Sequence, residues 1–187
     1  MIDLEKIKLD LKNRLSDYRY GHSVRVAEEA KKLASYYKIN ENNAYLAGLL
    51  HDIAKEFSII ENKNWITKYH LSEDLLNDKN LKTCHAEIGA VVAKELYGVS
   101  DDISQTIKYH TIGNVNMTML DKIVFIADKI ESGKSYPGID EERILAYQDI
   151  DEALILCLQN NKKKVESEKR LFNEDSDKVL NYFLSKR

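Results

Sequence analysis

One proline, Pro137, stands in a chain of 187 residues, and this scarcity constrains the fold more than any other feature of the sequence. Proline and glycine are the residues that most often interrupt helices and form turns. The chain has only seven glycines and few runs in which β-branched and polar residues alternate. It therefore predicts an all-α protein, in which residues 132–139, with both glycine and proline, form the clearest loop.

Apolar residues at helical spacing, with capping residues before them, predict the individual helices. The expected helical ranges are 3–15, a second range that includes 22–34, and then 41–55, 58–69, 83–98, 100–109, 119–131, 150–169 and 175–184. Asn40, Ser58, Thr83 and Ser100 are the expected caps of four of these helices. Residues 72–80 are polar and predict a loose helix or a loop. No repeat or linker divides the chain, so we expect one domain over residues 1–187.

Composition excludes several classes of protein. Hydrophobic residues make up 43% of the chain and charged residues 32%, which is typical of a globular protein. The net charge of −3 gives no basic excess, so nucleic acid is not expected as a partner. No apolar run predicts a membrane span, and the charged first residues do not resemble a signal peptide. Cys84 and Cys157 do not predict a disulfide framework, so we expect a cytoplasmic protein without a membrane partner.

The dipeptide His51-Asp52 follows the apolar stretch 44–50, which predicts a buried helix. Buried polar groups are costly unless they are paired, and a metal ion is one partner that satisfies an imidazole and a carboxylate together. Lys55 lies four residues after His51 and three after Asp52, on the same helical face. A cation beside a metal-binding pair indicates a ligand that carries phosphate.

Other histidines extend this pattern. Four of the five lie at or near the ends of expected helices, beside small or apolar residues: His22, His51, His85 and His110. His70 lies in a polar stretch and is expected at the surface, whereas Asp128 interrupts an apolar run. Four imidazoles with Asp52 and Asp128 suit iron, manganese, zinc, cobalt or nickel better than calcium. Six ligands exceed what one catalytic metal usually takes, so we expect two metals, with Asp52 as the better placed bridge.

Such a site supports hydrolysis. Two metal ions about 3.5–4 Å apart hold a bridging hydroxide and clamp the phosphoryl oxygens on either side. Arg25, three residues after His22, and Lys55 are placed to bind the remaining phosphates, and Thr111 could donate a hydroxyl. Singly, each residue has a simpler interpretation, because a lone histidine is more often a satisfied core or surface residue than a ligand. Asp128 could be an ion-pair partner, and the cations could be solvated. The joint pattern favours the metal site.

This ordered pattern resembles the HD-domain superfamily of metal-dependent phosphohydrolases. The matching residues are His22 in Gly21-His22-Ser23-Val24-Arg25, the pair in His51-Asp52-Ile53-Ala54-Lys55, and Asp128 in Ala127-Asp128-Lys129-Ile130-Glu131. With His85-Ala86-Glu87-Ile88-Gly89, His110-Thr111-Ile112-Gly113 and Tyr136-Pro137-Gly138, the match is closest to the YqeK family. It covers residues 11–184, and it implies a single-domain helical bundle that hydrolyses diadenosine tetraphosphate symmetrically to two ADP at a di-iron centre.

The resemblance assigns roles to individual positions. The implied metal ligands are His22, His51, Asp52, His85, His110 and Asp128, with His51 and Asp52 as the catalytic pair. Arg25, Lys55 and Thr111 are the implied polyphosphate contacts. The family has proline and arginine where this chain has Ser132 and Lys134, so Lys134 is expected to bind substrate as a point charge without the arginine fork. This difference puts the nucleotide preference in question.

Alternatives remain open from the sequence. One is an HD-type nucleotidase or phosphodiesterase that acts on another nucleotide. The Gly-Tyr-Pro tripeptide that usually marks the cyclic-dinucleotide branch is absent. Another is a non-catalytic nucleotide-binding helical protein whose metal is structural. The two metals, divalent or trivalent, are expected to be iron, with manganese, cobalt, nickel or zinc as alternatives. The sequence does not determine the oligomeric state, and a homodimer is one possibility.

Overall fold

The computed structural model describes residues 3–77 and 80–187, and within these residues it contains ten α-helices, one 3-10 helix and no β-strand. The α-helices are α1 (Leu4–Arg14), α2 (Asp17–Tyr36), α3 (Glu41–Leu50), α4 (Ile59–Tyr69), α5 (Cys84–Tyr97), α6 (Asp101–Tyr109), α7 (Met119–Ile130), α8 (Ile139–Leu145), α9 (Ile150–Ser167) and α10 (Glu174–Leu184). The 3-10 helix η1 spans Glu73–Leu76, inside the polar stretch 72–80, of which residues 78 and 79 lie outside the described residues. The predicted all-α fold is confirmed.

Most helices begin where the capping residues predict. The side chains of Asn40, Ser58 and Ser100 each accept a hydrogen bond from a backbone N–H in the first turn of the following helix. Thr83 was expected to cap α5 in the same way, and this is wrong. Its side chain makes no capping bond and instead donates to the carbonyl of Asn80 at 3.0 Å.

The predicted helix over residues 41–55 is too long, because α3 ends at Leu50. Beyond it the backbone tightens into turns, in which the N–H of Ile53 donates to the carbonyl of Leu50 at 3.0 Å. The His51 ring also forms a hydrogen bond with the last turn of α3, because its Nδ1 lies 2.7 Å from the carbonyl oxygen of Gly48. His51 and Asp52 therefore stand on a tight turn at the end of a buried helix.

Helix α8 was not expected from the sequence. It has only seven residues, three of them acidic in the first turn, and Gly138 before it has a φ of 91° and offers no capping side chain. A helix this short is not stable by itself. Its stability comes from contacts with the rest of the chain, and Arg143 makes three of them with the segment after α7.

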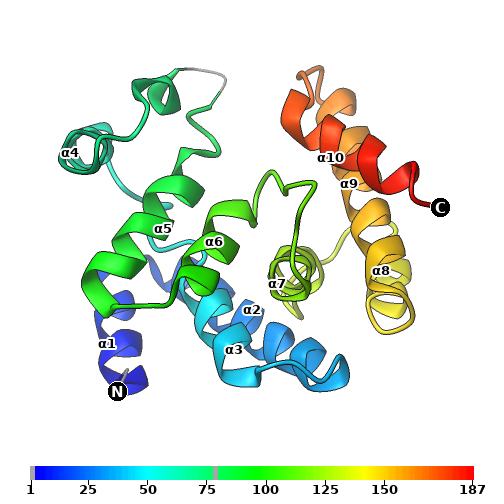
Figure 1. Ribbon diagram of the computed structural model, residues 1–187, viewed down its shortest axis with the longest axis horizontal. Coiled ribbons are helices and arrows are strands. Elements are labelled where there is room, and N and C mark those ends of the chain that lie inside the picture. Colours follow the sequence, from blue (N-terminus) through cyan, green and yellow to red (C-terminus); the bar gives the residue numbers. More distant parts are fainter. Residues whose placement is uncertain (1–2, 78–79) are drawn as a thin grey trace.

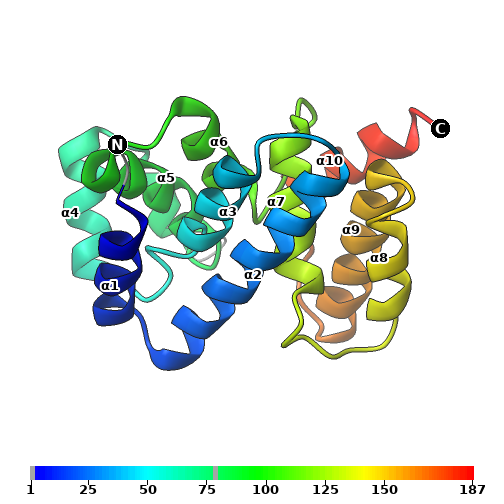
Figure 2. The ribbon, with the colours of Figure 1, turned by 90° about the horizontal axis from the view of Figure 1, so that it is seen from below.

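Helix α7 is the central element. Figure 1 shows it end-on, with α5 and α6 on one side and α8, α9 and α10 on the other. Figure 2 shows α2 running obliquely beneath these layers, with α3 beside it. Several of the largest fully buried side chains come from α7, among them Phe125, Ile123 and Ile126, and Leu49 and Leu50 of α3 join the same core. Among the described residues, no helix has the length and apolar character needed to cross a membrane.

The close approach of α2 and α3 depends on Gly48. A Cβ atom at this position would lie 2.9 Å from the Cα of Ala27, a distance that real Cβ atoms essentially never show. Only a glycine allows the two backbones to come this near. The end of α3, which carries His51, is thereby held against the part of α2 that carries His22.

Candidate metal centre

All six predicted metal ligands meet in the interior, although they come from five separate segments of the chain. They are His22 on α2, His51 and Asp52 after α3, His85 on α5, His110 after α6 and Asp128 on α7. None of them is more than 8% exposed. Buried polar side chains at this density need partners, and here the carboxylates of Asp52 and Asp128 face the imidazoles at 3.0–3.8 Å.

The carboxylate of Asp52 lies between two groups of imidazoles. Its Oδ1 is 3.2 Å from Nε2 of His85 and 3.6 Å from Nε2 of His110. Its Oδ2 is 3.4 Å from Nε2 of His51 and 3.8 Å from Nε2 of His22. Each oxygen therefore faces a different pair of histidines, which is the arrangement expected of a bridging carboxylate.

Asp128 completes one of the two groups. Its Oδ1 lies 3.0 Å from Nε2 of His22 and 3.8 Å from Nε2 of His51. We call this group the first half-site: His22, His51, Asp128 and Oδ2 of Asp52. The second half-site consists of His85, His110 and Oδ1 of Asp52. Two sets of three residues each bring their ligand atoms within 4.8 Å of one another. They are His22, His51 and Asp52 in the first half-site, and Asp52, His85 and His110 in the second.

The outer ring nitrogens show which tautomer the histidines adopt. Nδ1 of His51 lies 2.7 Å from the carbonyl oxygen of Gly48, and Nδ1 of His110 lies 2.6 Å from that of Ile107. A carbonyl only accepts, so both Nδ1 atoms carry the proton and both Nε2 lone pairs face the cluster. Metal-binding histidines are usually oriented in this way. Nε2 of His51 is buried and has no hydrogen-bond partner among residues 3–77 and 80–187, and a bound cation would fill that role.

The third oriented histidine is His22. Its Nδ1 lies 3.1 Å from Oε1 of Glu131, a carboxylate that is 2% exposed. Arg25 pairs with the same carboxylate, with Nε 2.6 Å from Oε2. Burial opposes ionisation of Glu131, but Arg25, the N–H of Gly133 and His22 hold its pKa below the ordinary value. Glu131 is therefore an acceptor that fixes the His22 ring, a role that the sequence did not predict.

Electrostatics favour metal binding at Asp52 and at the two imidazoles of the second half-site. Burial would raise the pKa of Asp52, but its imidazole neighbours His51, His110 and His85 hold that pKa well below its ordinary value. Burial lowers the pKa of His85 to about 4, and it also lowers the pKa of His110. At neutral pH the cluster thus presents an ionised carboxylate and neutral imidazoles on the second half-site.

Cationic side chains surround the cluster. Nη1 of Arg19 lies 2.6 Å from Oδ2 of Asp52, and Nζ of Lys129 lies 2.6 Å from Oδ2 of Asp128. Neither was predicted, although Arg19 is three residues before His22 and so shares its face of α2.

The predicted phosphate contacts fall in different places. Nζ of Lys134 is 3.6 Å from Oδ1 of Asp128, and Nζ of Lys55 is 3.2 Å from Nε2 of His85, so both adjoin the cluster. Arg25 is held by Glu131 at the edge of the first half-site. The buried hydroxyl of Thr111 has no hydrogen-bond partner in the described part of the chain, and Thr111 lines a separate cavity of about 370 Å³ against α10.

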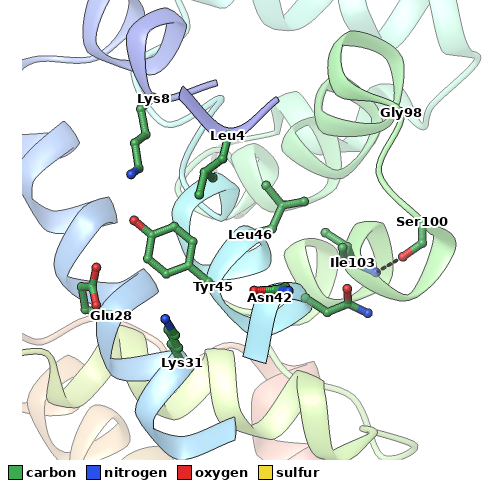
Figure 3. Close-up of a pocket in the computed structure, with 11 residues that line it drawn as sticks. Leu4, Lys8, Glu28, Lys31, Asn42, Tyr45, Leu46, Gly98, Ser100 and Ile103 are labelled. Atoms are coloured by element: carbon green, nitrogen blue, oxygen red, sulfur yellow. Dashed lines mark hydrogen bonds between the residues drawn. The ribbon is translucent and has the colours of Figure 1, made fainter. Parts of the chain in front are cut away.

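A larger cavity, of about 760 Å³, lies away from this centre. Figure 3 shows it between α1, α2, the start of α3 and the turn before α6, with Lys8, Lys31 and Tyr45 among its lining residues. None of the six predicted ligands lines it. The candidate metal centre is therefore identified by its buried imidazoles and carboxylates. It does not coincide with this larger cavity.

Comparison with known proteins shows the family to which this chain belongs. The sequence profile of the HD domain matches residues 19–133, a segment that includes all six predicted ligands, and the chain belongs to the HD-domain family. It is 39% identical to the symmetrical bis(5'-nucleosyl)-tetraphosphatase of Staphylococcus aureus, with 78% of this chain and 75% of that protein covered. It is 38% identical to the protein of the same name in Bacillus subtilis, with 80% and 81% covered.

A solved structure shares the whole architecture. The crystal structure of a predicted HD superfamily hydrolase involved in NAD metabolism, from Clostridium acetobutylicum, superposes with a TM-score of 0.91 at 31% identity. The match covers 100% of both chains. The predicted family, the helical fold and the predicted class of enzyme, a hydrolase, are thereby confirmed.

Proposed function

We propose that this protein is a two-metal phosphohydrolase that cleaves dinucleoside polyphosphates symmetrically, converting diadenosine tetraphosphate and water to two ADP. The observation that carries the proposal is the position of Asp52, whose two carboxylate oxygens face separate sets of buried imidazoles. The names of the relatives at 38–39% identity support the substrate and the symmetry of the cleavage.

The donor set fits transition-metal ions. Imidazole nitrogens and carboxylate oxygens suit iron, manganese, zinc, cobalt and nickel, and three of the imidazoles are oriented by outer partners. We propose iron as the resident metal in both half-sites. When bound, such ions would polarise phosphoryl oxygens and lower the pKa of a water molecule. The buried free thiols of Cys84 and Cys157 support the proposed reducing, cytoplasmic setting.

The chain's own cations would bind the polyphosphate. Arg19, Lys55, Lys129, Lys134 and Arg25 surround the cluster and outnumber its three carboxylates. A chain of four phosphates compensates this excess of positive charge. A guanidinium binds phosphate oxygens in pairs, whereas the three ammonium groups act as point charges.

Among these cations, Arg19 is the one best placed to bind a reacting phosphate. Its Nη1 contacts Asp52, while its Nε is buried without a hydrogen-bond partner among the described residues. A buried unpaired donor of a charged group costs free energy, and a phosphate oxygen would satisfy it. Arg19 would thus hold a phosphate next to the carboxylate that divides the two half-sites.

The reaction needs one bond to form and one to break. The oxygen of water bonds to one of the two central phosphorus atoms, and the bond from that phosphorus to the central bridging oxygen breaks. One ADP carries the oxygen from water and the other keeps the bridging oxygen, while the protons of water pass to solvent at neutral pH. The cations around the site stabilise the charge that develops on the departing diphosphate.

Product analysis tests this proposal. Purified protein loaded with Fe²⁺, and in parallel with Mn²⁺, is incubated with diadenosine tetraphosphate, and the nucleotides are separated by ion-exchange chromatography. We expect ADP as the only product. ATP with AMP would contradict symmetrical cleavage, and the absence of turnover together with activity on nucleoside monophosphates or guanosine tetraphosphate would favour another HD-type phosphohydrolase.

A further inference from the structure

The segment after α7 delivers two charged groups to the first half-site. Oε1 of Glu131 lies 3.1 Å from Nδ1 of His22, and Nζ of Lys134 lies 3.6 Å from Oδ1 of Asp128. Both residues belong to the loop 131–138, which joins α7 to α8. The path of this loop therefore sets the orientation of the His22 ring and the charge beside Asp128.

Arg143 of α8 fixes that path. Its Nε donates to the carbonyl of Ile130 at 3.0 Å, and its Nη2 donates to the carbonyls of Glu131 at 3.1 Å and Lys134 at 3.0 Å. The last carbonyls of a helix lack partners within the helix. A guanidinium presents its donors in one rigid plane, so a single side chain ties the end of α7 to the loop beyond it.

A second contact holds the same loop from its other end. The hydroxyl of Tyr136 donates to the buried carboxylate of Glu142 and lies 3.1 Å from the carbonyl of Lys129. The side-chain amide of Asn160 on α9 donates to the other oxygen of Glu142 at 2.8 Å. Helix α8 is thus anchored to α9 while it holds the loop.

The loop itself leaves little space for rearrangement. The N–H of Gly133 donates to Oε2 of Glu131 at 2.5 Å. A Cβ atom at Gly133 would lie 2.5 Å from Nε of Arg25, so the guanidinium of Arg25 packs directly over the loop backbone. The side chain of Glu131 is consequently held by the loop, by Arg25 and by His22 together.

We infer that Arg143 is a positioning residue for the first half-site. It contacts none of the six proposed ligands and acts through Glu131 and Lys134, whose backbone carbonyls it binds. Partners that orient metal ligands typically change metal affinity or activity by about 10–100-fold when they are removed. The inference rests on the two-metal centre proposed above. It also gives a role to α8, the helix that the sequence did not predict, because α8 carries Arg143.

Metal titration of an Arg143→Gln variant tests the inference. Glutamine is uncharged and cannot span three carbonyls. The full chain is stripped of metal with a chelator and titrated with Mn²⁺ by isothermal calorimetry, because binding is then measured apart from turnover. We expect the wild-type protein to bind two Mn²⁺ ions, and the variant to bind one of them about 10–100-fold more weakly while the other changes by less than about twofold.

Two further variants separate positioning from stability. Arg187→Gln removes an arginine that pairs with Glu152 far from the loop, and it should bind both ions as the wild type does. Arg143→Lys keeps the charge without the fork, and it should restore only part of the lost affinity. If only the positive charge mattered, Arg143→Lys would bind Mn²⁺ as tightly as the wild type. That result would contradict the role of the guanidinium geometry.

Circular dichroism and thermal melting check the fold of each variant. If Arg143→Gln unfolds, Tyr136→Phe decides the question, because it removes one hydroxyl from the same loop. It should weaken the same Mn²⁺ ion, by a smaller factor. A wild-type protein that binds two ions, with Arg143→Gln and Tyr136→Phe binding both as tightly, would overturn the inference. A wild-type protein that does not bind two ions would contradict the proposed function instead.

Discussion

The ring of His51 is completely enclosed, and its two nitrogens have different surroundings. Nδ1 is bound to the carbonyl of Gly48, whereas Nε2 faces Asp52 and Asp128 and has no hydrogen-bond partner among the residues that the structure describes. An unpartnered buried nitrogen costs free energy that a cation would recover. The His51 ring is therefore the side chain of the cluster that most directly indicates a bound cation.

Replacing His51 by glutamine should empty the first half-site. A ligand is lost from the interior, so we expect kcat to fall by more than the roughly 10–100-fold that removal of an outer partner costs. Steady-state kinetics and metal analysis of the purified variant provide the measurement. His70→Gln, at the exposed end of α4, is the matched control and should retain both metals. Full activity of His51→Gln would refute its role as a ligand.

Arg19 shows why some site residues are not predicted from sequence. An arginine three residues before His22 has the same spacing as many solvated surface arginines, and nothing in its neighbours marks it. Its role depends on Asp52, which lies 33 positions later and 2.6 Å away. Glu131 shares this property, because it meets His22 only when α7 packs against α2.

An Arg19→Gln substitution should weaken substrate binding. A hydrogen bond from a charged donor is worth about 1.5–3 kcal/mol, so kcat/KM for diadenosine tetraphosphate should fall about 10–100-fold. Arg14→Gln, which removes an arginine paired with Asp10 on the surface of α1, is the control. An unchanged kcat/KM in the Arg19 variant would exclude Arg19 from the substrate site.

At the scale of elements, local chemistry explains what the sequence predicts well. Ser58 and Ser100 stand at helix starts because a side-chain oxygen satisfies a backbone N–H nearby in the chain. The end of α3 and the existence of α8 were not predicted for the opposite reason. Both depend on bonds across the fold or within a tight turn, such as those of Arg143 to three carbonyls. Periodicity carries no information on such contacts.

The crossing of α2 and α3 gives a testable case at this scale. Alanine is a better helix former than glycine by about 1 kcal/mol, so propensity alone favours Gly48→Ala. The added Cβ would nevertheless stand 2.9 Å from the Cα of Ala27, and overpacking of this kind costs about 1–3 kcal/mol. We expect a net loss in the free energy of unfolding, measured by urea denaturation.

Gly21→Ala is the matched substitution within α2. Its new Cβ would meet only the flexible end of Arg25, 3.2 Å away. This variant should be as stable as the wild type or more so. Equal stabilisation by both substitutions would show that α2 and α3 are not in close backbone contact at Gly48.

At the scale of the whole molecule, the centre is a consequence of topology. Five segments spread from His22 to Asp128 each contribute proposed ligands, and only the packing of α2, α3, α5, α6 and α7 brings them together. The sequence predicts the residues and the bridging role of Asp52, since the order of the motifs is informative. It does not predict which histidines share each half-site, because this requires distances across the core.

Burying these histidines should make the metal-free protein sensitive to acid. The pKa of His85 falls from an ordinary value near 6.5 to about 4 because of burial, so the unfolded chain binds a proton between these values that the folded protein does not. Stability is therefore lost as the pH falls from about 6.5 towards 4, and His110 shifts in the same direction. The raised pKa of His51 acts oppositely, since Asp52 and further hydrogen bonds outweigh its burial.

The contribution of His85 is isolated by comparing two proteins. Between pH 7 and pH 5 the wild-type protein should lose about 2 kcal/mol more unfolding free energy than His85→Gln, which has no proton to bind. Urea denaturation of both chelator-treated proteins at the two pH values gives the difference. Identical pH dependence would show that His85 is not buried in its neutral form.

The division of the ligands by Asp52 is best tested by anomalous diffraction from crystals grown with Mn²⁺. We expect two anomalous peaks per chain, one among His22, His51 and Asp128 and the other beside His85 and His110, with one oxygen of Asp52 directed at each. A single peak, or two peaks of which Asp52 contacts only one, would contradict the two-metal centre.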